Sequence, residues 1–100
     1  MIFHMNTTEL KKLLEQQTPV RVIDVREPDE FAEGAIIPES ENLPMNQAIA
    51  DASAGTLPKD QKIIVVCRSG GRSGVVMQAL KEHGYDVENL EGGIEAWIKG

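Results

Sequence analysis

The stretch that decides the fold lies past the middle of the chain and reads Ile63-Ile64-Val65-Val66-Cys67-Arg68-Ser69-Gly70-Gly71-Arg72-Ser73. Its first four residues are apolar and β-branched, as in a central strand of a parallel sheet that helices cover on both faces. A glycine-containing turn follows, and an apolar stripe then predicts a helix over 73–83. The members of this stripe are Val75, Val76, Ala79 and Leu80. This succession of strand, turn and helix is typical of an α/β domain.

The same alternation of short apolar runs and helical patterns continues on either side of this stretch. A capping box formed by Asn6 and Glu9 marks the start of the first helix, and Pro28 and Gly34 bracket a short one. The predicted helices cover 7–16, 29–33, 45–54, 73–83 and 92–99, and the predicted strands cover 20–25, 63–66 and 87–90, with a further short strand near 42–43. We therefore predict an α/β fold with a central, mostly parallel sheet and helices on both faces, in one domain that spans residues 1–100.

Length, composition and charge exclude several classes of protein. The chain has 100 residues, of which 41% are hydrophobic and 26% charged, as in an ordinary globular domain. The net charge of −6 argues against nucleic acid or an anionic membrane as a partner, and no apolar run is long enough to span a membrane. Because no signal-peptide pattern opens the chain, we expect a cytoplasmic protein, and its small size suggests a monomer. Six carboxylates and no basic residue lie within 27–41, which favours a solvated acidic face over a docking patch for a basic partner.

The single cysteine, Cys67, is expected at the carboxyl end of the central strand, where ligands bind in open α/β sheets. Two glycines in the next turn, Gly70 and Gly71, let several backbone N–H groups point inward, and a helix begins close by. Arg68 and Arg72 add two positive charges. Each of these features favours a thiolate over a thiol and attracts an anion. The loop therefore predicts a reactive thiolate that faces an oxyanion.

Other interpretations of this loop fit less well. A lone cysteine after a strand is often an inert core residue, but such a residue has no use for two flanking arginines. The glycines match neither the phosphate-binding loop of nucleotide-binding proteins nor the dinucleotide-binding fingerprint. The two histidines, His4 and His83, lie far from Cys67 in the predicted fold. We therefore expect exposed histidines, no Cys–His catalysis, no metal site and no cofactor.

Five segments carry a resemblance to a known family, and together they span nearly the whole chain. They are Val22-Ile23-Asp24-Val25-Arg26-Glu27-Pro28-Asp29-Glu30-Phe31, Gly34 with Pro38 and Asn42-Leu43-Pro44, the loop from Cys67 to Ser73, Gly84-Tyr85-Asp86-Val87, and Leu90-Glu91-Gly92-Gly93-Ile94-Glu95-Ala96-Trp97. In this order they resemble the single-domain members of the rhodanese, or thiosulfate sulfurtransferase-like, family. The resemblance implies a central parallel sheet of about five strands and a sulfur-carrying nucleophile at Cys67. In that family the thiolate takes the outer sulfur of a small anionic donor such as thiosulfate, and sulfite leaves. A thiophilic acceptor, either cyanide or a thiol that can belong to a protein, then removes the sulfur from the cysteine persulfide.

The resemblance also implies roles for the loop residues. Their backbone N–H groups would cradle the persulfide, and the two arginines would hold the anionic donor. The substrate-binding residues are thus expected to be Arg68, Ser69, Gly70, Gly71, Arg72 and Ser73. Asp24 and Arg26, at the end of an earlier strand, would either support the site or form a structural ion pair, and the structural pair is the favoured interpretation. Because the chain has no second cysteine, the acceptor must come from outside, which predicts ping-pong kinetics.

Two alternative functions and one departure from the family pattern accompany this hypothesis. Phosphatase loops of the Cys-x5-Arg type enclose five residues, whereas Cys67 and Arg72 enclose four, which favours the rhodanese loop. A carrier module that receives sulfur from a protein partner, with little thiosulfate activity, would use the same persulfide. The segment 34–41 has Ala35 where the family often has histidine, and it carries one extra residue, so the resemblance determines neither the conformation of this segment nor its contact with the site, but the nucleophile is unaffected.

Overall fold

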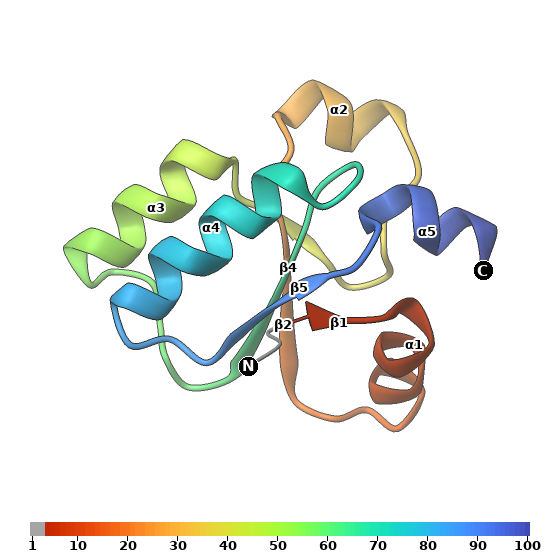
Figure 1. Cartoon of the computed structure of the whole chain (residues 1–100), viewed down its shortest axis with the longest axis horizontal. Coiled ribbons are helices and arrows are strands. Elements are labelled where there is room, and N and C mark those ends of the chain that lie inside the picture. Colours follow the sequence, from red (N-terminus) through yellow and green to blue (C-terminus); the bar gives the residue numbers. More distant parts are fainter. Residues whose placement is uncertain (1–3) are drawn as a thin grey trace.

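The computed structural model describes residues 4–100 and shows a five-stranded, wholly parallel sheet with helices on both faces (Figure 1). In chain order the elements are β1 (His4–Met5), α1 (Thr7–Glu15), β2 (Val20–Asp24), α2 (Pro28–Glu33), β3 (Glu41–Asn42), α3 (Met45–Ala54), β4 (Lys62–Val66), α4 (Gly71–Glu82), β5 (Val87–Leu90) and α5 (Gly93–Lys99). The strands lie in the order β1-β5-β4-β2-β3, so the strand predicted to be central is the middle one. The predicted α/β fold is confirmed. Within the described residues, no helix has the length and apolar character needed to cross a membrane.

Strand β4 is buried on both faces, as its apolar run predicts. Ile63 and Val65 belong to the core beneath α3 and α4, whereas Ile64 and Val66 belong to the core beneath α1 and α5. All four side chains are completely inaccessible to solvent. Helix α2 covers neither face of the sheet. It sits over the carboxyl end of the sheet, beside the turn that leads from β4 into α4 (Figure 1).

The sequence does not predict strand β1. Two residues are too few to show a hydrophobic period, and these two are extended because they pair with Asn89 and Leu90 of β5. This short edge strand completes the five strands that the family resemblance implies. The two histidines are exposed, as expected. The side chain of His4 is 43% accessible beside Glu91, and His83 caps the far end of α4.

Helix α4 begins at Gly71, two residues before the predicted start. Gly70 precedes it with φ 110°, a left-handed conformation that glycine adopts without steric cost. Its carbonyl accepts the N–H of Gly74 at 3.0 Å and so starts the helical hydrogen bonds early. The predicted loop therefore ends at Gly70, and Arg72 and Ser73 lie in the first turn of the helix.

The buried face of α4 also differs from the predicted stripe. Val75 is 56% exposed, whereas Met77, which the prediction omits, is buried. The buried members are Ser73, Val76, Met77 and Leu80. They follow the spacing i, i+3, i+4, i+7, which is the set that a helix of 3.6 residues per turn presents to one side.

Candidate active site

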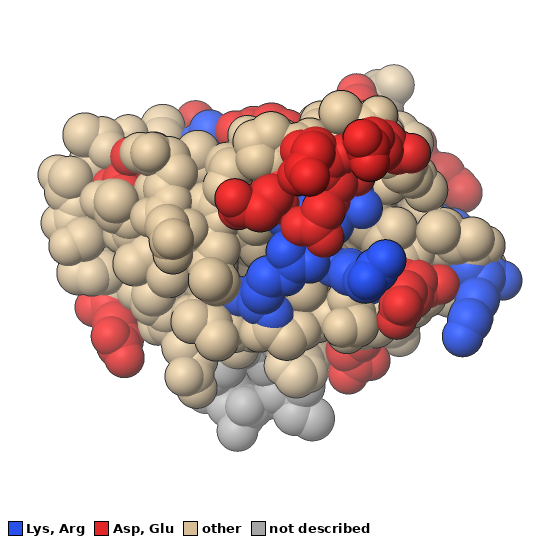
Figure 2. All heavy atoms as spheres, turned by 90° about the horizontal axis from the view of Figure 1, so that it is seen from above, with Lys and Arg blue, Asp and Glu red and all other residues tan. Residues whose placement is uncertain are grey.

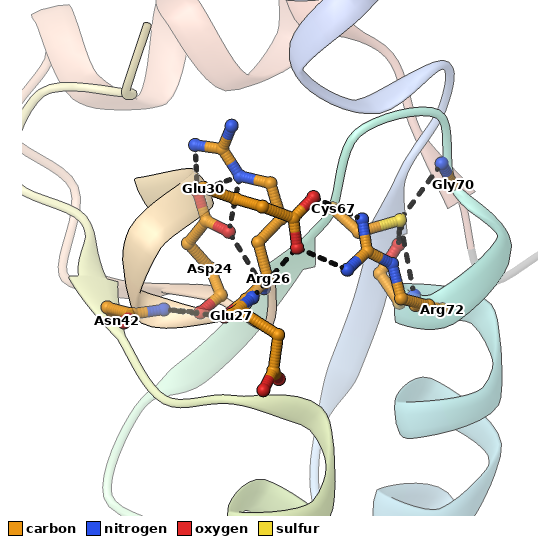
Figure 3. A network of polar contacts seen from close by, with 9 residues as sticks. Asp24, Arg26, Glu27, Glu30, Asn42, Cys67, Gly70 and Arg72 are labelled. Carbon is orange, nitrogen blue, oxygen red and sulfur yellow. Dashed lines mark hydrogen bonds and ion pairs between the residues drawn. The ribbon is translucent and has the colours of Figure 1, made fainter. Parts of the chain in front are cut away.

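Cys67 lies immediately after β4, at the carboxyl end of the sheet and at the base of the turn into α4 (Figure 3). Its accessibility is only 1%, and it forms no disulfide. Three hydrogen-bond donors converge on the sulfur. The N–H of Gly70 is 3.1 Å from Sγ, the N–H of Ser73 is 3.4 Å away, and the hydroxyl of Ser73 is 3.3 Å away. The first turn of α4 and the left-handed Gly70 thus surround one atom with donors.

This environment favours the thiolate. Burial has the largest single effect and raises the pKa of the Cys67 thiol, because a buried charge loses hydration. The hydroxyl of Ser73 and the backbone N–H groups of Ser73, Gly70 and Ser69 act in the opposite direction, since each stabilises negative charge on sulfur. Together these donors outweigh burial, so the pKa of Cys67 lies below the ordinary value for a thiol. A thiolate of this kind is a nucleophile near neutral pH.

The loop backbone is held in place by the start of α5. The carbonyl of Cys67 accepts the N–H of Ile94 at 2.9 Å, and the carbonyl of Arg68 accepts the N–H of Glu95 at 3.0 Å. Gly93 makes this approach possible, since a Cβ there would overlap the Cys67 carbonyl and lie 2.7 Å from the carbonyl carbon of Arg68. The sequence analysis missed this contact. The only signal was the pair of glycines before the last helix, which a tight turn also explains.

Asn89 is a second residue that the sequence analysis missed. Its side chain is buried in β5, and its Nδ2 donates to the carbonyl of Gly70 at 3.0 Å. That bond orients Oδ1 toward Ser73, whose hydroxyl lies 2.5 Å away. The one hydroxyl proton of Ser73 can be donated either to Asn89 or to the Cys67 sulfur, but not to both at once. Asn89 therefore links the loop backbone to the hydroxyl that contacts the nucleophile.

The two loop arginines, for which the sequence predicts the same role, have different surroundings in the structure. Arg68 is exposed, and its side chain makes no ion pair or hydrogen bond with any residue in 4–100. Arg72 instead forms a bidentate ion pair with Glu30 of α2, with Nη1–Oε1 at 2.7 Å and Nη2–Oε2 at 3.0 Å (Figure 3). Hydrogen bonds from the Arg72 guanidinium, and then from the N–H of Glu27, lower the pKa of Glu30 to about 2. Glu30 was not among the predicted site residues.

The remaining predicted loop residues have distinct positions. Ser69 is exposed at the tip of the turn, and only its backbone N–H acts toward the sulfur. Gly71 opens α4, and a Cβ there would meet nothing within 4 Å, so a glycine is not sterically required at that position. Of the two adjacent glycines, only Gly70 has the left-handed backbone that turns the chain around the sulfur.

Asp24 and Arg26 form a buried ion pair at the end of β2. Arg26 Nη2 is 2.8 Å from Asp24 Oδ2, and the same nitrogen donates to the carbonyl of Ala35 at 3.0 Å. Asn42 donates to the backbone carbonyls of both residues. The pair therefore joins the end of β2 to β3 and to the segment after α2, and no hydrogen bond connects it to Cys67 within the described residues. At Ala35 a backbone carbonyl makes the contact, so the side chain that departs from the family pattern is not used in it.

The surface around the loop carries both charges. Figure 2, seen from above the sheet end that holds α2 and the loop, shows a group of acidic side chains directly beside a group of basic ones. Besides Glu30, the segment that forms α2 and its N-cap presents Glu27, Asp29 and Glu33 to solvent. Among the residues described, no group of histidine, cysteine and carboxylate side chains is arranged to hold a metal ion.

Comparisons with known proteins agree on one family. The sequence model of the family described as Rhodanese-like domain matches residues 6–99. Among curated proteins, YtwF of Bacillus subtilis, which is described provisionally as a sulfurtransferase, is 38% identical over 96 residues, covering 96% of this chain and 90% of YtwF. A protein of Allochromatium vinosum named "Sulfurtransferase" is 35% identical over 100 residues, covering 99% and 91% of the two chains. Among solved structures, a rhodanese-like domain protein from Staphylococcus aureus is 37% identical with a TM-score of 0.83, covering 97% and 91% of the two chains.

Proposed function

The chain belongs to the rhodanese-like domain family, and we propose that it moves sulfane sulfur from an anionic donor such as thiosulfate to a thiophilic acceptor through a persulfide on Cys67. Relatives named as sulfurtransferases match it over nearly their whole length, which supports sulfur transfer as its general activity. The observation that carries the specific proposal is the convergence of three hydrogen-bond donors on the buried Cys67 sulfur. These donors stabilise the thiolate that must attack.

In the first step the Cys67 thiolate attacks the outer sulfur of thiosulfate. A sulfur–sulfur bond forms to Cys67 as the bond between the outer sulfur and the sulfonate breaks, and sulfite leaves with the bonding electron pair. The product is an anionic persulfide, Cys67–S–S⁻. The N–H groups of Gly70 and Ser73, which already contact Sγ, would stabilise its charge. Arg68, exposed and without a partner in residues 4–100, would attract the donor's sulfonate, while Arg72 is shared with Glu30.

In the second step the acceptor attacks the outer sulfur of the persulfide. Cyanide leaves as thiocyanate, or a thiolate leaves as a new persulfide, and the electron pair of the broken bond returns to Cys67 as a thiolate. No outside oxidant or reductant is needed. The chain has no second cysteine, so the acceptor comes from another molecule. A lone reduced thiol suits a reducing compartment such as the cytoplasm, and we propose a monomer acting there without metal or cofactor.

Steady-state kinetics test this proposal. With thiosulfate and cyanide varied together, we expect thiocyanate formation with double-reciprocal lines that stay parallel, because sulfite leaves before cyanide binds. Cys67→Ser should abolish turnover while the circular dichroism spectrum stays that of the wild type. Intersecting lines would contradict the two-step scheme, and turnover by Cys67→Ser would contradict the assignment of the nucleophile.

A second candidate function is a carrier that another protein loads with sulfur and that has little activity on thiosulfate. The observation that favours it is the ion pair of Arg72 with Glu30, which leaves Arg68 as the only unpartnered arginine of the loop within the described residues. The two candidates differ in the first step. The enzyme forms its persulfide from thiosulfate alone, whereas the carrier forms it only when a persulfide-bearing protein is added.

A further inference from the structure

Building on the proposed function, we propose that Glu30 is a specificity-determining residue that selects sulfur donors by their charge. By holding Arg72 in a bidentate ion pair, it disfavours dianionic donors such as thiosulfate and favours monoanionic donors of the thiosulfonate or persulfide type. Glu30 does not touch the nucleophile. It acts through Arg72, which the loop sequence by itself assigns to the donor.

The geometry of the pair shows that the guanidinium is already occupied by an anion. Glu30 and Arg72 come from different helices, α2 and α4, and both carboxylate oxygens are matched to guanidinium nitrogens at 2.7 and 3.0 Å. A donor carrying a sulfonate group would present the same kind of oxygens to the same nitrogens. A dianion must therefore either displace Glu30 or bind beside its negative charge.

The charges around the loop make the binding of a sulfur donor depend on the donor's own charge. Arg68 and Arg72 give the loop two positive charges, and Glu30 reduces this sum to one. Glu27 and Asp29 add further negative charge at the start of α2. An electrostatic penalty scales with the charge of the ligand, so Glu30 opposes thiosulfate about twice as strongly as a monoanionic donor of similar size. The backbone N–H groups around the sulfur attract both donors.

The ion pair between Glu30 and Arg72 persists at neutral and mildly acidic pH. The pKa of Glu30 is about 2, so its carboxylate remains ionised in any neutral or mildly acidic solution. The side chains of Glu30 and Arg72 are 33% and 35% exposed, so water and salt screen the pair but do not remove it. Changing the charge of Glu30 is therefore the direct way to test its effect.

Glu30→Gln changes that charge with little change in shape. Glu30 Oε1 also accepts the N–H of Glu27 at 3.0 Å, which caps α2, and a glutamine oxygen can accept the same bond. The glutamine amide has no charge to pair with Arg72, so the guanidinium becomes available to the donor. Glu33→Gln is the matched control. Glu33 lies on the same helix, is exposed and makes no ion pair with a described residue, and its substitution removes the same charge without touching Arg72.

The experiment compares thiosulfate with methanethiosulfonate, a monoanion from which Cys67 would take the outer sulfur while methanesulfinate leaves. Cyanide is the acceptor for both donors. For Glu30→Gln we expect the KM for thiosulfate to fall by about threefold to fivefold and the KM for methanethiosulfonate to fall by only about twofold, effects of the size that a partly exposed ion pair supports. Glu33→Gln should leave the ratio of the two KM values unchanged, and added salt should reduce the effect of Glu30→Gln.

A double substitution shows whether Glu30 acts through Arg72. In an Arg72→Met background only the direct repulsion between Glu30 and the donor remains, so Glu30→Gln should change the ratio of the two KM values by less than it does in the wild type. An equal change in both backgrounds would contradict the claim that Glu30 acts through Arg72. An unchanged ratio in Glu30→Gln alone, an equal change in Glu33→Gln, or an equal loss of activity with both donors would overturn the specificity role while leaving the sulfurtransferase function intact. If neither donor loads Cys67 in the wild-type protein, the proposed function fails, and the role of Glu30 fails with it.

Discussion

Replacing Ser73 by alanine should raise the pKa of the Cys67 thiol. The Ser73 hydroxyl is one of three donors around Sγ, at 3.3 Å, and the substitution removes this donor while the N–H of Ser73 stays in place. Cys67 is only 1% accessible, so water cannot easily take the place of the lost donor. Losing a donor to a charged acceptor destabilises the thiolate relative to the thiol, and the pKa therefore rises.

The size of the change follows from the strength of one such bond. Hydrogen bonds to charged groups contribute about 1.5–3 kcal/mol, and 1.36 kcal/mol corresponds to about one pKa unit. Sulfur is a weak acceptor, and Asn89 competes for the same hydroxyl proton at 2.5 Å, so the lower end of this range applies. We expect the pKa of Cys67 to rise by about one unit in Ser73→Ala.

The assay is the rate of alkylation by iodoacetamide as a function of pH. Cys67 is the only cysteine of the chain, so the rate reports on this thiol alone. Ser69→Ala is the matched control, because the Ser69 side chain is exposed and only its backbone N–H, which the substitution keeps, acts toward the sulfur. An unchanged pKa in Ser73→Ala, or an equal rise in Ser69→Ala, would refute the claim that the Ser73 hydroxyl stabilises the thiolate.

Three further predictions follow from the same contacts. Gly93→Ala should lower the free energy of unfolding by about 2–3 kcal/mol in urea titrations, because the new Cβ overlaps the loop backbone and the left-handed φ of 57° adds strain. Gly55→Ala, which shares a left-handed φ but has open space, should cost less, and equal costs would contradict the packing argument. Arg68→Ala should raise the KM for thiosulfate more than Arg72→Ala does, because Arg72 is already paired with Glu30; the opposite order in initial-rate kinetics would contradict this account. The folded-state pKa of Glu30 lies below its ordinary value of 4.5, so its carboxylate should make the wild type more stable than Glu30→Gln. This difference in unfolding free energy should be complete above about pH 4.5 and disappear as the pH falls toward 2. A difference that does not change with pH would show that the charge of Glu30 is not its source.

The sequence pattern predicted those helices and strands that a few consecutive residues determine. The apolar run of β4, the capping box at Asn6 and the proline at the start of α2 each depend on a few consecutive residues, and each corresponds to an observed strand or helix start. Strand β1 has no such local cause, because its two residues become a strand only through pairing with β5. Cys67 and its loop were likewise marked by consecutive residues at the end of a recognisable strand.

The partners of the loop could not be predicted in the same way. Glu30 is 42 residues from Arg72 in the sequence, and nothing in its own segment indicates which cation it meets. Asn89 reaches Gly70 and Ser73 only because β5 lies next to β4 in the sheet. In each case the sequence identifies the residue type, but the contact depends on how distant elements pack.

The intact mass of the reduced protein, recorded after incubation with thiosulfate and again after cyanide is added, shows whether Cys67 carries sulfur. We expect a gain of one sulfur atom in the wild type, its complete loss to cyanide as thiocyanate, and no gain in Cys67→Ser. A protein whose free thiol is verified and whose mass does not change with thiosulfate would contradict the proposed enzyme. It would leave the carrier loaded by another protein as the function of this thiolate.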